Sequence, residues 1–112
     1  ASNKPQRYSY KAVQSLLEKG HKTFPVHPVI KQIDSLEVYS SLSALPEPIH
    51  TITVYISAAN SNLHADEMLA SGAQRIIFNP GAENPELSSR LQFAGIEALD
   101  ACTLVLLSTN QF

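Results

Sequence analysis

Apolar residues recur along this chain with two spacings, one typical of helices and one typical of strands. Apolar residues recur at helical spacing over 10–19, which predicts a helix that Ser9 caps and Gly20 ends. The β-branched run 50–56 gives the strongest strand prediction. Weaker patterns predict two more helices, over 63–71 and 85–94, and three more strands, over 22–26, 75–78 and 96–99.

The segments between these elements carry turn signals. Residues 43–48 predict a helical turn that two prolines interrupt, and 58–62 predict a polar turn. Asn79-Pro80-Gly81 predicts a sharp turn, and Asn84 is a plausible cap for a helix whose first residue is a proline. The apolar segment 103–107 fits either a helix or a strand.

The alternation of strands with helices predicts an α/β fold of the doubly wound class, with a mostly parallel sheet and helices on both faces. In such sheets the ligand binds beyond the carboxyl ends of the strands. The chain reaches its first helix without a preceding strand, and in this class that first strand is central. We therefore predict one domain over 1–112, truncated at its N-terminus, with about 8–10 residues upstream supplying a strand and a glycine. Otherwise another chain fills the gap or the sheet rearranges.

Composition narrows the class of protein. The length of 112 residues, 44% of them hydrophobic, suits one compact domain. The single cysteine, Cys102, forms no internal disulfide, and no apolar run approaches the roughly 20 residues that span a membrane. The N-terminus lacks the pattern of a signal peptide, so the default expectation is a cytoplasmic protein without a membrane partner.

The charge is distributed unevenly. The formal net charge is -2, which argues against a nucleic-acid partner. Residues 1–31 hold six basic side chains and one acid, a net charge of +5, whereas residues 32–112 hold two basic side chains and nine acids, a net charge of -7. This separation indicates either an anionic small ligand at one end of the molecule or a solvated helix face that carries scattered lysines.

Candidate chemistry lies in four turns, which we expect to converge on one rim of the sheet: 1–9, 27–28, 55–60 and 79–83. The first turn delivers Arg7 to a helix N-terminus, which is a natural phosphate site. The four histidines have no metal-ligand spacing, and Cys102 has no visible base, so it is interpreted as a structural thiol. Asp66 and Glu67 fit a solvated helix face, and the dinucleotide, P-loop and nucleophile-elbow motifs are absent.

Five stretches together resemble one family: ASNKPQRYSY (1–10), FPVHP (24–28), LPEPIHTITVYI (45–56), GAQRIIFNPGAENPEL (72–87) and ACTLVLLST (101–109). Over nearly its whole length the chain resembles the small bacterial CoA-binding proteins. These are similar to the Rossmann-like CoA-binding domain of the succinyl-CoA synthetase α subunit. The resemblance implies a Rossmann-like sheet that holds coenzyme A at its rim.

The resemblance also implies binding residues by position. The glycine-rich turn after the first strand and its passage into the first helix correspond to Ala1, Ser2, Asn3, Lys4, Arg7, Tyr8 and Ser9. His27-Pro28 stands where the family usually has Asn-Pro, near the adenosine. The stretch that lines the nucleotide corresponds to Tyr55, Ile56 and Ser57, and the turn near the pantetheine corresponds to Asn79, Pro80 and Gly81.

The favoured function is therefore binding of coenzyme A or an acyl-CoA without catalysis. The phosphorylated histidine of the synthetase belongs to a second domain that has no counterpart in this sequence. Two alternatives stay open: another nucleotide such as NAD, NADP or FAD on the same fold, or a ligand-free interaction or oligomerisation domain. Homodimerisation is also left open.

Overall fold

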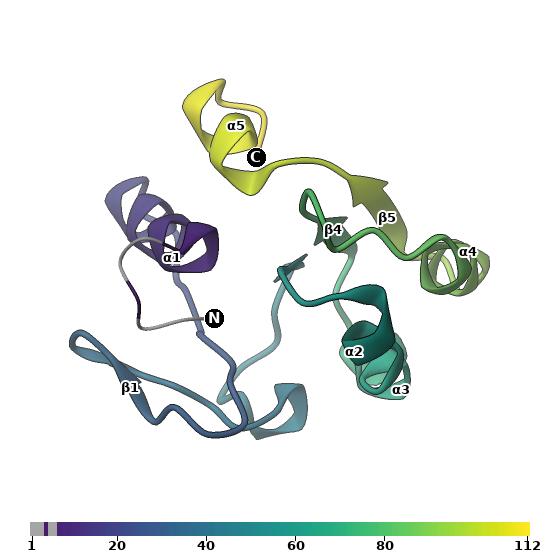
Figure 1. Cartoon of the computed structure of the whole chain (residues 1–112), viewed down its shortest axis with the longest axis horizontal. Helices are drawn as coiled ribbons and strands as arrows, with labels where there is room; N and C mark the ends of the chain where they lie inside the picture. Colours follow the sequence, from purple (N-terminus) through teal and green to yellow (C-terminus); the bar gives the residue numbers. More distant parts are fainter. Residues whose placement is uncertain (1–3, 5–6) are drawn as a thin grey trace. The chain divides into compact units, whose positions relative to one another are not determined.

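The structure is a computed structural model that describes residue 4 and residues 7–112 (Figure 1). The chain divides into two compact units. One unit consists of residues 47–103, and the other consists of residues 1–46 together with 104–112. Among the described residues, no helix is both long enough and apolar enough to cross a membrane.

The unit 47–103 is built on a parallel sheet of three strands, β3 (Thr51–Val54), β4 (Arg75–Phe78) and β5 (Glu97–Asp100). The strands stand in the order β3-β4-β5, and their last residues are in register, Val54 with Phe78 and Phe78 with Asp100. All three strands agree with the predicted strand positions. The α/β, Rossmann-like class predicted from the sequence is confirmed.

Strand β4 is the middle strand, and its sequence fits that place. Ile76, Ile77 and Phe78 are fully buried. Two of these are β-branched, and all three are large and apolar, as expected for a parallel strand that is covered on both faces. Strand β3 forms one edge of this sheet, because no further strand pairs with it within residues 4 and 7–112. The predicted upstream strand stays a prediction.

Three helices connect the strands: α2 (Ala58–Asn62), α3 (Ala65–Ala70) and α4 (Pro85–Phe93). They lie on the same side of the sheet in Figure 1, as right-handed crossovers between neighbouring parallel strands require. Helix α4 begins as predicted, because Asn84 Oδ1 accepts a hydrogen bond from Leu87 N at 3.1 Å. The polar turn predicted over 58–62 is wrong: this segment is α2, and Ser57 caps it. Five residues are too few to show helical periodicity.

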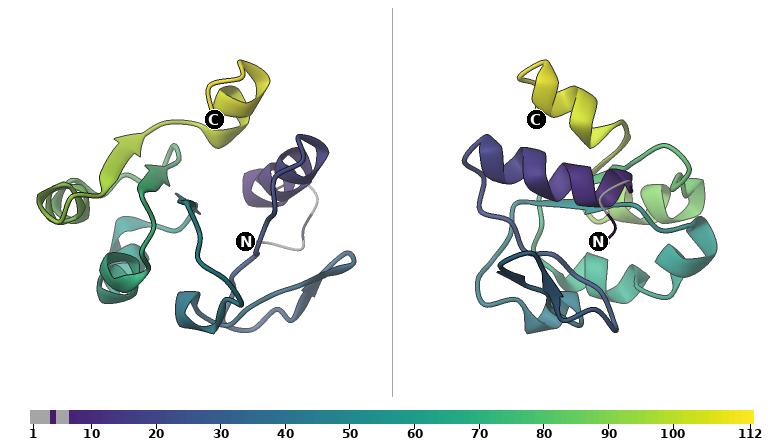
Figure 2. Two further views of the ribbon diagram at one scale, coloured as in Figure 1. Left: turned by 180° about the vertical axis from the view of Figure 1, so that it is seen from behind. Right: turned by 60° about the vertical axis from the view of Figure 1, so that its left-hand side comes forward.

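In the other unit, α1 (Tyr8–Glu18) is the main regular element, seen from the side as an unbroken helix in the right-hand view of Figure 2. It buries Ala12, Val13 and Leu16, which confirms the predicted apolar stripe. It ends before Gly20, whose φ of +83° is the left-handed conformation that stops a helix. The predicted cap is wrong, because the helix begins two residues earlier, at Tyr8, and its N-cap is Arg7.

The strand predicted over 22–26 does not form. Only Val26 makes a strand-like contact there, an isolated parallel bridge to Tyr39. Pro25 accounts for the failure, since a proline has no N–H to contribute to a ladder. Instead, β1 (Gln32–Ile33) and β2 (Leu36–Glu37) form a short antiparallel hairpin.

The remaining elements are helical. The helical turn predicted over 43–48 appears as the short 3-10 helix η1 (Leu42–Ala44), before the prolines. The segment whose type the sequence left open is a helix, α5 (Thr103–Ser108).

Candidate functional site

Three loops follow the three parallel strands of the unit 47–103, and all lie at the carboxyl edge of the sheet. Residues 55–57 follow β3, residues 79–81 follow β4, and residues 101–103 follow β5. Because the ends of the strands are in register, these loops are neighbours in space. This is the edge at which parallel sheets bind ligands.

Asn79 joins the three strand ends. Its side chain is 1% exposed, and its Nδ2 donates to Val54 O at 3.0 Å. Its Oδ1 accepts from Thr103 N at 2.8 Å. Both ends of the amide are therefore bonded to the backbone of neighbouring segments. We interpret Asn79 as the residue that positions this edge.

The predicted turn 79–81 is confirmed and is closed by local bonds. Ala82 N donates to Asn79 O at 2.8 Å, and Gly81 N donates to Glu83 Oε1 at 2.9 Å. Gly81 has φ +89°, which favours glycine at this position. The Glu83 carboxylate thus lies against the backbone of Gly81, whose N–H is already engaged by it.

Two hydroxyl groups at this edge are buried and have no hydrogen-bond partner among residues 4 and 7–112. They are Tyr55 Oη, from the loop after β3, and Thr103 Oγ1, from the first residue of α5. Burial raises the pKa of Tyr55, the nearby Thr103 hydroxyl opposes that rise, and the charge of Cys102 adds to it. Cys102 itself is half-buried. The other two predicted residues of this segment, Ile56 and Ser57, are exposed.

The N-terminus of α1 is the basic candidate, and it belongs to the other unit. Arg7, the N-cap, is exposed, and its side chain makes no capping hydrogen bond. The first turn contains no acid, and the Lys11 ammonium lies 5.5 Å from the centre of the Tyr8 ring. Backbone N–H groups of a first turn carry a partial positive charge, so this end suits a phosphate.

Asp34 places a carboxylate on the flank of the same helix. It accepts hydrogen bonds from Tyr10 Oη at 2.6 Å and from Gln14 Nε2 at 2.8 Å. The hydrogen bond to Asp34 raises the pKa of Tyr10, since ionisation of the phenol would remove a donor from the carboxylate. The hairpin turn that carries Asp34 is thereby held to α1.

His27 closes the turn that the sequence placed near an adenosine. Its Nδ1 accepts hydrogen bonds from the N–H groups of Val29 and Ile30, each at 3.0 Å. An asparagine Oδ1 forms turns of the same kind, so the histidine can replace it as an acceptor. Burial lowers the pKa of His27, which keeps Nδ1 available as an acceptor.

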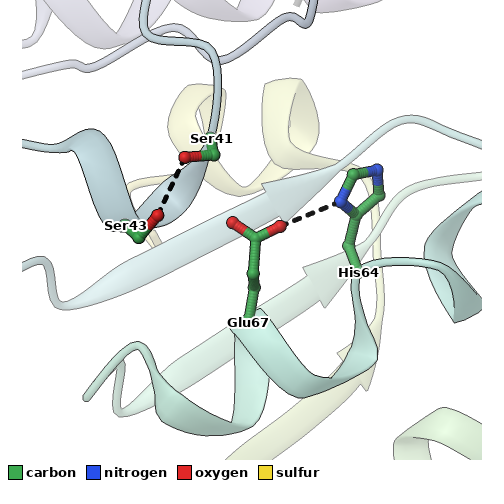
Figure 3. Close-up of polar contacts among 4 residues, drawn as sticks. All are labelled: Ser41, Ser43, His64 and Glu67. Carbon is green, nitrogen blue, oxygen red and sulfur yellow. Dashed lines mark hydrogen bonds and ion pairs between the residues drawn. The ribbon is translucent and has the colours of Figure 1, made fainter.

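A further polar pair lies on the surface of the unit 47–103. His64 Nδ1 and Glu67 Oε2 are 3.1 Å apart at the start of α3, and Figure 3 shows them facing each other. The neighbouring Asp66 is exposed and lies 3.5 Å from Arg90. Asp66 and Glu67 therefore serve local surface pairs, in line with the predicted solvated face.

The predicted site residues fall into three groups. Residues 55–57 and 79–81 are brought together at the carboxyl edge of the sheet, whereas Lys4, 7–9 and 27–28 belong to the other unit. Ala1, Ser2 and Asn3 lie outside the described residues. The convergence of all four turns on one rim stays a prediction. Within residues 4 and 7–112, no three acidic, histidine or cysteine side chains gather into a metal site.

Sequence reasoning missed the third loop of this edge. The strand predicted over 96–99 ends just before 101–103, so the rule applied to the other loops would also have pointed to Thr103. The bonds of Asp34 carried no such signal, because no motif links a hairpin turn to a helix twenty residues earlier.

Comparison with known proteins identifies the class. A family model described as CoA binding domain matches residues 1–108. An uncharacterized protein of known crystal structure is 33% identical, with a TM-score of 0.91 over 100% of this chain and 92% of its own. A conserved hypothetical protein from Pyrococcus furiosus is 30% identical, with a TM-score of 0.83 over 94% of this chain and 91% of its own.

One similar structure has an activity in its name. It is a dinucleotide-forming acetyl-coenzyme A synthetase from Ca. Korarchaeum cryptofilum, solved in complex with phosphate and ADP. The identity is 20%, with a TM-score of 0.76 over 90% of this chain and 24% of the synthetase chain. At that identity the likeness concerns the fold alone.

Proposed function

Because the chain belongs to the CoA binding domain family, we propose that it binds coenzyme A or an acyl-CoA without catalysing a reaction of its own. Each unit is considered by itself: in one, the start of α1 is the proposed phosphate contact, and in the other, the loops at the carboxyl edge of the sheet are proposed as a separate contact region. The residues proposed to take part are those that the sequence suggested, with Asn79 acting as a positioning residue.

The observation that carries the proposal is the basic start of α1. Arg7 and Lys11 are exposed there, the first turn contains no acid, and the Arg7 side chain makes no capping hydrogen bond. Coenzyme A carries about four negative charges on its phosphates. Guanidinium and backbone N–H donors at a helix N-terminus are the groups that bind such charges best.

The loops of the unit 47–103 would contact the uncharged part of the ligand. A phosphate is disfavoured at the turn 79–81, because the Glu83 carboxylate already accepts a hydrogen bond from Gly81 N and would repel the phosphate. Ile56 and Pro80, both exposed, offer apolar surface for the uncharged part of a CoA molecule.

A charge-matched pair of variants on one helix tests the proposal. Arg7→Ala removes a positive charge at the start of α1, and Lys19→Ala removes one at its end. Isothermal titration with CoA in a reducing buffer is expected to show a several-fold loss of affinity for Arg7→Ala and almost none for Lys19→Ala. Raising the salt concentration should weaken binding by the wild type more than binding by Arg7→Ala, because salt screens the lost contact.

A thermal-shift panel of CoA, NAD, NADP, FAD and ATP separates the alternatives. The proposal requires CoA to give the largest rise in melting temperature. A larger rise in melting temperature with another nucleotide would identify that nucleotide as the ligand. The absence of any rise would favour an interaction domain.

A further inference from the structure

Glu83 holds the backbone donor of the turn that follows β4. Gly81 N donates to Glu83 Oε1 at 2.9 Å, although the Glu83 side chain is otherwise exposed. A backbone N–H in a turn beyond a strand is a group that binds the carboxylate of a ligand well. Here a carboxylate of the protein already takes that place. A second carboxylate at the turn 79–81 would meet an occupied donor and a charge of its own sign.

No positive charge in the segments of this edge offsets that repulsion. The residues that follow the strands of the unit 47–103, over 55–60, 79–88 and 100–103, contain no lysine, arginine or histidine. The exposed Glu86 stands in the first turn of α4, and the exposed Asp100 ends β5. An anionic group at this edge would therefore meet carboxylates in these segments and no cation.

The two arginines of the same unit stand elsewhere. Arg75 is the first residue of β4, at the amino end of the sheet, and its Nε donates to Thr51 Oγ1 at 3.1 Å. Arg90 belongs to the last turn of α4 and lies 3.5 Å from Asp66. That turn leads directly into the start of β5, because Ile96 N donates to Leu91 O. Both arginines are thus tied to residues away from the carboxyl edge.

We propose that Glu83 is a specificity-determining residue, which admits acyl-CoA molecules with an uncharged acyl group and rejects those whose acyl group ends in a carboxylate. The inference rests on the proposed function and adds to it the class of acyl group. The uncharged part of CoA ends in the thiol that carries the acyl group, so that group lies beside the loops that contact this part. An uncharged chain meets neither obstacle there, and Ile56 and Pro80 offer it exposed apolar surface.

This selectivity works by excluding the wrong ligand. The repulsion from Glu83 adds no contact to the favoured ligand and costs affinity only for the anionic one. Because Glu83 is exposed, dissolved salt should screen the repulsion and narrow the difference between the two ligands.

A pair of ligands that differ in one group tests the proposal. Propionyl-CoA and malonyl-CoA have acyl chains of equal length, which end in a methyl group and in a carboxylate. Isothermal titration of the full chain at pH 7.5 is expected to show several-fold tighter binding of propionyl-CoA. The same titrations at higher salt should give a smaller ratio of the two affinities.

Three variants identify the residue responsible. Glu83→Gln keeps an oxygen that can accept from Gly81 N and removes the charge, so the melting temperature should hold while the affinity for malonyl-CoA rises several-fold relative to propionyl-CoA. Glu83→Lys should reverse the preference. Glu97→Gln removes the same charge from the first residue of β5, at the opposite edge, and should keep the preference of the wild type.

The outcomes separate this inference from the proposed function. If CoA and both acyl-CoA molecules bind the wild type with equal affinity, the role of Glu83 is refuted and the binding function stands. The role is equally refuted if Glu83→Gln keeps the full preference, or if Glu97→Gln reduces it as much. If neither CoA nor either acyl-CoA binds, the binding function fails and the inference fails with it.

Discussion

The two compact units hold their backbone by different means. In the unit 47–103, β3, β4 and β5 pair continuously in parallel register, and the Asn79 side chain links their ends. In the other unit, the strand pairing of the described residues consists of one hairpin, whose strands have two residues each, and one isolated bridge. Side chains serve as acceptors there instead, with His27 closing one turn and Asp34 receiving two donors from α1.

The two units also differ in their charge. Six of the eight basic residues fall within 1–31, whereas the unit 47–103 contains only Arg75 and Arg90. One unit therefore contains the ordered sheet edge, and the other contains most of the basic residues. The comparison suggests that perturbing the first should affect stability most, and that perturbing the second should affect pH response and binding.

The largest expected effect is that of Asn79→Ala. The substitution leaves Thr103 N without its acceptor and removes a buried donor to Val54 O, so we expect a loss of about 2–3 kcal/mol in the free energy of unfolding. Urea denaturation measures this. Asn60→Ala is the matched control, since Asn60 is exposed on α2 and should change stability by less than about 0.5 kcal/mol. Equal costs for the two variants would mean that the strand ladder alone holds this edge.

A smaller effect on folding stability is expected from protonation of the His27 ring, and it depends on pH. The pKa of His27 is lowered in the folded chain, so the unfolded chain binds the proton more readily. The contribution of the neutral ring is thus complete above the unfolded pKa of about 6.5 and is lost as the pH falls through and below that value. Protonation of Nδ1 would also remove the acceptor for Val29 N and Ile30 N.

His27→Asn keeps an acceptor that does not titrate. Between pH 7.5 and pH 5.5, the melting temperature of the wild type should fall further than that of His27→Asn. The other histidines are common to both proteins, so their contribution cancels. If the melting temperatures of the two proteins fall by the same amount, the histidine ring does not support this turn.

The sequence predicted the two units unequally, for physical reasons. Strands such as 75–78 are buried apolar runs bounded by turn residues, and Asn84-Pro85 starts a helix by a local rule, so both can be read from neighbouring residues. The run 22–26 also looks like a strand, but Pro25 deprives it of a donor. The role of His27 as a turn acceptor follows from contacts that leave no periodic pattern.

The candidate site, too, could be predicted from the sequence only in part. Topology alone placed 55–57 and 79–81 at one edge, because carboxyl ends of parallel strands coincide. The choice of Asn79 as a positioning residue, and the unpaired oxygens of Tyr55 and Thr103, depend on burial and on bonds across β3, β4 and β5. These are properties of packing, which a single sequence does not specify.

Binding of coenzyme A is the proposed function, with the start of α1 and, in the other unit, the loops at the carboxyl edge of the sheet as separate proposed contact regions. A 15N-labelled chain titrated with CoA in a reducing buffer tests it residue by residue. We expect the largest amide shifts at Tyr8, Ser9 and Tyr10 and in the loops 55–57 and 79–81, with little change in α4 around Leu87 and Leu91. Saturation without shifts at the start of α1, or shifts confined to α4, would contradict the account.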